Sequence, residues 1–206
     1  MEMTWLGAEP GNDAEVLLCQ VLDACDRLGT AVYIYGGYAV EAHVGRRVRA
    51  HSDVDFVAWR HDWPALQVVV ARAGLDFACD APTALHVRQS GRTIADVLLA
   101  EQHPDGFPFV RAPLGANPLP PSSFAEALAV NMWGRRAHVV SLECLLVMKA
   151  SGNFNGPRQP PDPKHARDLE LIRSLLPEAA LARLLPYCRV IPAPPEDRAT
   201  LSHVDA

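Results

Sequence analysis

Two aspartates, Asp53 and Asp55, interrupt an otherwise apolar run that ends at Trp59, and no other feature constrains the chain as strongly. The neighbouring Val54 and Phe56 favour a strand embedded in a core over a solvated loop. Because side chains at positions i and i+2 of a strand share one face, the two carboxylates lie close together. Like charges at this separation are costly without a cation. The spacing therefore predicts a metal site, and hard oxygen ligands of this kind suit Mg²⁺.

A third carboxylate, Asp96, lies in another apolar run with strand character, Thr93 to Leu99. If this strand pairs beside the first, the three carboxylates converge. Such a cluster suits two Mg²⁺ ions, which together serve an in-line displacement at phosphorus. We expect Asp53 and Asp55 to ligate metal, and Asp96 to ligate the metal next to the attacking oxygen or to take the proton from that oxygen.

A glycine pair, Gly36 and Gly37, follows the β-branched and aromatic run Ala31 to Tyr35 and precedes the helical pattern Tyr38 to Val44. Backbone N–H groups at such a strand-to-helix turn are unobstructed by side chains and lie at the positive end of the helix dipole. The pair therefore predicts a phosphate cradle. A tight turn without a ligand is the alternative, because glycine pairs are common at strand ends.

Composition argues against several classes of protein. Of the 206 residues, 49% are hydrophobic and 21% are charged, and no apolar stretch approaches the roughly 20 residues that span a bilayer. The first residues lack a basic start followed by an apolar run, so we expect a cytoplasmic protein without a secretory signal or a membrane partner. Five scattered cysteines indicate neither a disulfide framework nor a zinc ribbon. The net charge of -5 disfavours an extended nucleic-acid-binding surface.

The order of the predicted elements indicates an α+β fold, in which a mixed sheet with packed helices precedes a helical region. The proline-rich segment Pro113 to Ser123 predicts a boundary between a domain of residues 1–115 and a smaller helical C-terminal domain of residues 116–206. The predicted helices are 13–28, 38–44, 64–73, 142–150 and 164–176, and the predicted strands are 31–35, 53–59, 84–89, 93–99 and 107–111.

The block from Gly36 to Phe56 reads Gly-Gly-Tyr-Ala-Val-Glu-Ala-x-x-Gly-Arg-x-x-Arg-x-His-Ser-Asp-Val-Asp-Phe. With the later Asp96, it resembles the polymerase-β-type nucleotidyltransferase superfamily, and more narrowly it is similar to the small aminoglycoside 2''-adenylyltransferases and the lincosamide nucleotidyltransferases. The resemblance implies that an N-terminal nucleotidyltransferase domain transfers a nucleoside monophosphate, usually AMP from Mg-ATP, to a hydroxyl of a small molecule. It also implies that the glycine pair contacts the phosphates and that the three aspartates form the metal and base triad.

Two cations, Arg49 and Lys149, are candidates for binding the nucleotide. Arg49 lies between the expected helix and the metal strand, where its guanidinium can hold a triphosphate oxygen with two hydrogen bonds. Arg46 and His51 lie in the same segment, and the alternative for all three is a solvated loop or a pair with Glu41. Related enzymes direct a lysine at the position of Lys149 towards the triphosphate, whereas a lysine at a helix C-terminus can also simply offset the helix dipole.

Other polar residues carry weaker signals. Lys164, Arg167 and Asp168 resemble the Lys/Arg-x-x-Asp pattern of the family's C-terminal helix, whose aspartate tends to be structural. The histidines, His86 among them, lack paired metal-ligand spacing, and we expect them to be surface or packing residues.

The leading hypothesis is a Mg²⁺-dependent nucleotidyltransferase that moves AMP from ATP to a hydroxyl of an aminoglycoside or lincosamide antibiotic, as a resistance enzyme does. The surplus of acid suits a polycationic aminoglycoside. One alternative is a nucleotidyltransferase toxin that modifies tRNA or protein, although the net charge counts against tRNA. The other is a nucleotide-binding module without catalysis. Relatives commonly have Trp for Tyr38, Asp for Glu41 and Glu for Ser52, and these differences leave the identity of the acceptor open. The sequence also leaves open whether the protein forms a homodimer.

Overall fold

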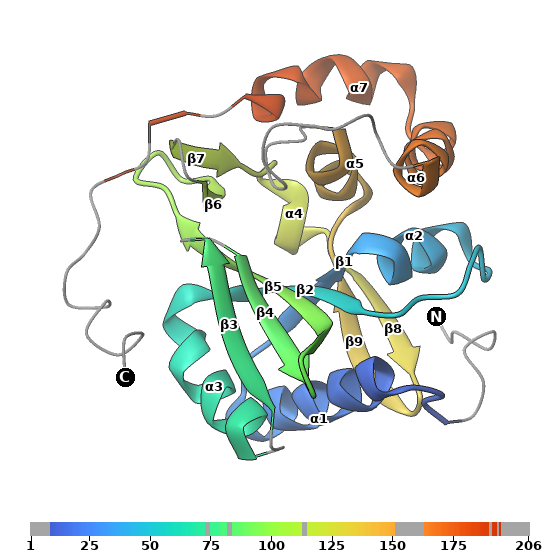
Figure 1. Ribbon diagram of the computed structural model, residues 1–206. Coiled ribbons are helices and arrows are strands. Elements are labelled where there is room, and N and C mark those ends of the chain that lie inside the picture. The colour runs from blue at the N-terminus through green and yellow to red at the C-terminus, as the bar shows by residue number, and fades with distance from the viewer. Residues whose placement is uncertain are drawn as a thin grey trace.

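One mixed β-sheet forms the centre of the computed structural model, which describes residues 9–72, 75–81, 84–112, 115–150, 163–189, 191, 192 and 194. Among these residues the strand order is β3-β4-β5-β2-β1-β9-β8, with β6 paired to β5 and β7 paired to β6 (Figure 1). The strands are β1 (Val32–Tyr35), β2 (Val54–Trp59), β3 (Asp76–Ala81), β4 (Ala84–Gln89), β5 (Arg92–Gln102), β6 (Pro108–Ala112), β7 (Gly115–Pro118), β8 (Leu128–Met132) and β9 (Arg135–Val139).

Helices cover the sheet on both sides. The helices α1 (Asp13–Leu28) and α3 (Trp63–Arg72) pack against each other along one face, whereas α2 (Gly36–Val44) contacts β1 and β2 and also α5 (Leu142–Ala150) and α6 (Pro163–Leu175) (Figure 1). The remaining helical elements are η2 (Arg60–Asp62), α4 (Ser122–Ala125), α7 (Glu178–Leu184) and η4 (Leu185–Cys188). The α+β class predicted from the sequence is therefore confirmed.

The first helix shows how local sequence sets an element's limits. Asn12 caps α1, because its side-chain oxygen accepts a hydrogen bond of 3.0 Å from the N–H of Glu15. Glu15 in turn accepts one of 2.6 Å from the N–H of Gly11, the residue before the cap, so a side chain of the first turn also ties down the chain that enters the helix. Gly29 ends the helix with a φ of 65°, a conformation that glycine adopts without steric cost.

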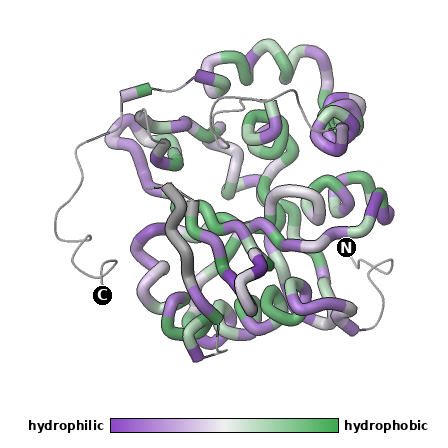
Figure 2. Tube along the Cα trace, viewed as in Figure 1, coloured by the Kyte–Doolittle hydropathy of each residue, from purple (hydrophilic) through white to green (hydrophobic). Residues whose placement is uncertain are grey.

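Alternation along the central strands separates an apolar face from a polar one. On β1 and β2, the fully buried Ile34 and Phe56 belong to the apolar core, while Tyr33 and Trp59 lie on the opposite face, where both rings contact Phe124 of α4. In Figure 2 the short helix α2 is largely apolar and α6 is largely polar, which fits their different burial. The polar side of the sheet carries the candidate site.

The segment after residue 115 departs from the expected helical region. Strands β8 and β9 lie within it, and β9 pairs in parallel with β1, so the central sheet draws on both sides of the predicted boundary. The two strands are joined at Trp133 and Gly134, which both have positive φ and make the tight turn that a hairpin needs. Apart from the four-residue α4, which precedes β8, the helices of this region begin only with α5 after β9, and the division at residues 115 and 116 stays a prediction.

Some expectations concern residues outside the described part of the chain. Residues 1–8, on which the expectation about a secretory signal rests, and residues 113 and 114 of the expected boundary segment lie outside it. Strands β3 and β7 were not predicted. None of the helices in the described ranges has the length and apolar character needed to cross a membrane.

Candidate active site

The predicted carboxylates occupy one row across the polar face of the sheet. Tyr35 of β1 lies opposite Asp55 of β2 in an antiparallel pair, and Asp55 lies beside Asp96 of β5 in a parallel pair. Cross-strand neighbours share a face, so all three side chains project to the same side. Asp53 directly precedes β2 and joins them, and one carboxylate oxygen from each aspartate lies within 4.8 Å of the others. The structure therefore brings together the three aspartates that the sequence singled out.

Electrostatics make this cluster receptive to a cation. Burial, reinforced by the charges of Asp53 and Asp96, raises the pKa of Asp55 to about 7, while Lys149 and Arg49 act weakly in the opposite direction. The same carboxylates add to the effect of burial in raising the pKa of the Tyr35 phenol well above its usual value. A bound cation would relieve this repulsion.

Divalent metal fits the donor set. Within the described ranges, Asp53, Asp55 and Asp96 are the one group of three acidic, histidine or cysteine side chains whose ligand atoms lie close enough to share an ion. All donors are carboxylate oxygens and none is a thiolate, which suits the hard ion Mg²⁺ better than Zn²⁺.

The glycine pair permits the close approach of α2 to this cluster. Gly36 has a φ of 68°, and a Cβ atom added there would lie 1.7 Å from Oδ2 of Asp55. A Cβ on Gly37 would lie 2.2 Å from Cε1 of His51 and 2.7 Å from Nη2 of Arg49. Tyr35 occupies the N-cap and makes no side-chain capping hydrogen bond, so α2 begins uncapped beside the carboxylates. That geometry suits a phosphate cradle, which stays a prediction.

A buried glutamate organises the segment between α2 and β2. Oε1 of Glu41 accepts hydrogen bonds from the N–H groups of Val48 (2.7 Å) and Arg49 (3.0 Å), and Nε2 of His51 lies 3.0 Å from the same oxygen. Burial raises the pKa of Glu41, but these contacts, above all the one with His51, outweigh burial and hold the pKa below its usual value. His51 thus has Glu41 as its partner, which is the alternative that the sequence left open, whereas Arg46 is exposed.

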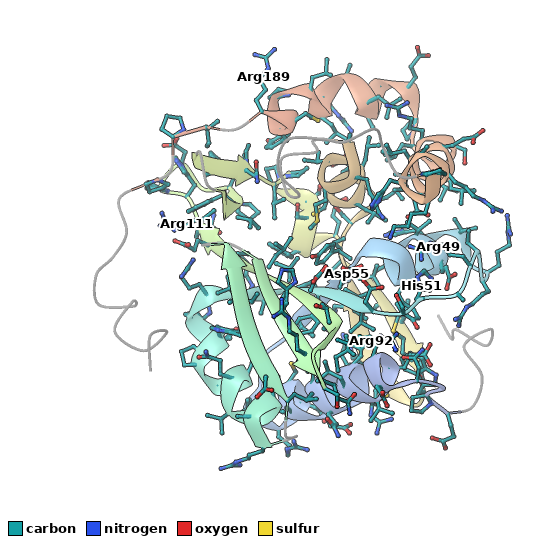
Figure 3. The ribbon with its side chains drawn as sticks, in the orientation of Figure 1. Arg49, His51, Asp55, Arg92, Arg111 and Arg189 are labelled. Carbon is teal, nitrogen blue, oxygen red and sulfur yellow. The ribbon has the colours of Figure 1, made fainter. Side chains whose placement is uncertain are left out.

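The two cations proposed for the nucleotide meet at one acid of the helical region. Nζ of Lys149 donates to Oδ2 of Asp168 over 2.8 Å, and Nη2 of Arg49 lies 3.8 Å from that oxygen. The Asp168 side chain is 2% exposed and that of Lys149 is 9% exposed. Arg49 approaches Gly37 and Asp55 approaches Gly36, so this cluster lies near the carboxylate row, and Figure 3 shows Arg49, His51 and Asp55 around the start of α2.

Sequence reasoning missed two neighbours of the row. Nδ1 of His86 on β4 lies 2.5 Å from Oδ1 of Asp96, a contact with the row that the expected surface or packing residue did not include. The sequence pattern indicates Tyr35 only as the end of a strand. Its place directly before the glycine pair, two residues from Tyr33 on the same face, was the available signal for a side chain beside Asp55.

The mixed sheet, the glycine pair at a helix start and the carboxylates on adjacent strands define a protein of the nucleotidyltransferase class. A profile of the aminoglycoside-2''-adenylyltransferase family matches residues 17–146, which is more than half of the chain. The chain belongs to this family, whose members are nucleotidyltransferase enzymes. No curated protein matches it.

Solved structures share the fold at low sequence identity. The antibiotic-resistance factor ANT(2'')-Ia in solution is 18% identical with a TM-score of 0.64, covering 82% of this chain and 88% of its own. A crystal structure of ANT(2'')-Ia with adenylyl-2''-tobramycin is 20% identical with a TM-score of 0.64, and the match covers 85% of this chain and 97% of the ANT(2'')-Ia chain. The lincomycin-bound lincosamide antibiotic adenylyltransferase LnuA is 16% identical with a TM-score of 0.60, and the match covers 81% of this chain and 100% of the LnuA chain.

Proposed function

We propose that this protein transfers AMP from ATP to a hydroxyl group of an aminoglycoside or lincosamide antibiotic, with Mg²⁺ held by Asp53, Asp55 and Asp96. The observation that carries the proposal is the convergence of these three carboxylates beside the uncapped start of α2. Family membership narrows the chemistry to nucleotidyl transfer, and the adenylylated tobramycin bound to ANT(2'')-Ia and the lincomycin bound to LnuA support antibiotics as the acceptors.

Each group in the site has a part in an in-line displacement. The acceptor oxygen forms a bond to the α-phosphorus of ATP, its proton passes to the carboxylate of Asp96, and pyrophosphate leaves with the electron pair of the bond that breaks. The N–H groups at the start of α2 bind phosphate oxygens, and Arg49 and Lys149 stabilise the triphosphate charge. Mg²⁺, when bound, offsets the negative charge of carboxylates and triphosphate and lowers the pKa of the attacking hydroxyl.

Mass spectrometry of the products tests this proposal. The purified protein is incubated with Mg-ATP and a panel of aminoglycosides and lincosamides, with uncharged tRNA assayed in parallel. We expect a mass increase of one AMP on at least one antibiotic, and none with the Asp53→Asn protein. Labelling of tRNA alone, or nucleotide binding without any product, would contradict the proposal.

A further inference from the structure

The side chain that meets Asp96 from outside the triad belongs to His86. The imidazole Nδ1 lies 2.5 Å from Oδ1 of Asp96, and the two side chains are 22% and 37% exposed. Strand β5 lies between β2 and β4, and the register aligns Asp55, Asp96 and His86 across these three strands. His86 therefore reaches Asp96 on the side opposite to Asp55.

A β-bulge puts His86 in this position. Near the turn of the β4–β5 hairpin, Gln89 pairs with Arg92 and Arg88 with Thr93, a register that would place His86 opposite Ala95. The register shifts by one residue between Val87 and Arg88, and His86 comes to lie opposite Asp96 instead. Because a shift of one residue exchanges the two faces of a strand, the bulge turns the imidazole to the carboxylate side.

We infer that His86 is a positioning residue for Asp96. The Nδ1–H group donates to Oδ1, which fixes the rotation of the carboxyl group and occupies one of its two oxygens. The other oxygen, Oδ2, is thereby left to serve the metal or the acceptor. This inference rests on the proposed function.

The proton balance of the transfer is simple with His86 in this place. The proton of the acceptor hydroxyl moves to Oδ2 of Asp96 as the new oxygen–phosphorus bond forms and pyrophosphate departs. His86 keeps its Nδ1 proton throughout and forms no bond to the substrate. Its contribution is orientation, and loss of a partner that orients a ligand carboxylate commonly costs about 10- to 100-fold in metal affinity or activity.

Two substitutions separate this function from simple strand packing. His86→Phe keeps a planar ring but removes the donor, whereas His86→Asn places an amide N–H near the position of Nδ1. We expect His86→Phe to lower kcat about 10- to 100-fold while KM for Mg-ATP changes less than about twofold, and His86→Asn to recover most of kcat. His138→Phe is the matched control, because His138 lies on β9 of the same sheet beside Tyr33, where we expect no effect.

Two readouts do not depend on turnover. The affinity of the protein for Mn²⁺ alone, measured by electron paramagnetic resonance, should fall about tenfold in His86→Phe and recover in His86→Asn. In the wild-type protein, the ¹⁵N chemical shifts of the His86 ring should show the proton on Nδ1. A proton on Nε2 with a bare Nδ1 would overturn the inference even if His86→Phe failed to fold.

The inference is also overturned if His86→Phe matches the wild type in kcat and Mn²⁺ affinity, or if His86→Asn is as impaired as His86→Phe. Failure of the proposed function looks different. In that case the wild-type protein adenylylates no antibiotic, while the Mn²⁺ affinities and the ring shifts still test whether His86 donates from Nδ1 to Asp96 and supports metal binding.

Discussion

The three aspartates on the sheet and the buried Asp168 of α6 (Pro163–Leu175) are carboxylate sites built in opposite ways. On the sheet, Asp53, Asp55 and Asp96 crowd together, and their repulsion raises the pKa of Asp55 to about 7. At α6, a single buried carboxylate, Asp168, lies between two cations of its own chain. The first site is incomplete without an added cation, whereas the carboxylate of the second already has cationic partners from its own chain. The contrast indicates that the sheet cluster is built for binding, and that Asp168 holds α6, α5 and the segment before β2 together.

Asp55→Asn should give the largest effect and should act on activity alone. Removal of one carboxylate weakens the metal site, so we expect adenylyl transfer to fall on the order of 10³-fold. The melting temperature in the presence of EDTA should stay equal or rise, because like-charge repulsion is relieved. Calorimetry and a transfer assay measure the two quantities. Asp105→Asn, at a side chain that is 77% exposed, is the control and should leave both unchanged. Transfer within tenfold of wild type would remove the distinction between the clusters.

Asp168→Asn should show the reverse pattern, with a loss of stability. Lys149 would lose its buried counter-charge, and breaking a buried pair costs about 3 kcal/mol or more in the free energy of unfolding. Urea denaturation measures this change. Asp23→Asn provides the comparison, since Asp23 pairs with Arg135 through two hydrogen bonds but is 43% exposed, and we expect less than about 1 kcal/mol there. Equal losses of unfolding free energy in the two variants would show that the burial of Asp168 does not increase its contribution to stability.

Gly36→Ala should disturb the sheet cluster through its geometry. The new Cβ would overlap Oδ2 of Asp55, so we expect a larger loss of stability than strain at φ alone produces, together with weaker Mn²⁺ binding. Gly45→Ala isolates that strain, because Gly45 has a φ of 77° and a Cβ there meets nothing within 4 Å. Its expected cost is about 1 kcal/mol. If the two alanine variants unfold at the same urea concentration, the close approach of α2 to Asp55 is not as described.

The pH dependence of metal binding should give the smallest effect. The folded pKa of Asp55, about 7, lies above the unfolded value of about 3.9, so without metal this group makes the protein less stable as pH rises from about 4 to 7. Mg²⁺ must displace the proton below pH 7, so we expect roughly tenfold weaker binding at pH 6 than at pH 8. Titration calorimetry at the two pH values measures this, and Asp55→Asn should abolish the difference. Equal affinities in the wild type would contradict the raised pKa.

Local signals in the sequence were sufficient for most of the first half of the chain. The helical pattern of residues 13–28, the glycine pair and the apolar strand with two aspartates each depend on neighbours close in sequence, and their elements begin and end near the predicted residues. Strands β8 and β9 were missed because their five-residue segments alternate too briefly to stand out. Their stability comes from the pairing of β9 with β1, about 100 residues away, and from the pairing of β8 with β9.

In the candidate site too, some features follow from local sequence and others from the packing of distant segments. The sequence by itself determined Asp53 and Asp55 as a pair, because strand periodicity alone puts side chains two residues apart on one face. It also determined the glycine pair beside them. Only the tertiary structure decided that Asp96 lies in register with Asp55, that a one-residue bulge turns His86 towards Asp96, and that Asp168 joins Lys149 to Arg49. Pairing partners, register shifts and helix docking are set by the packing of distant segments, which no local pattern encodes.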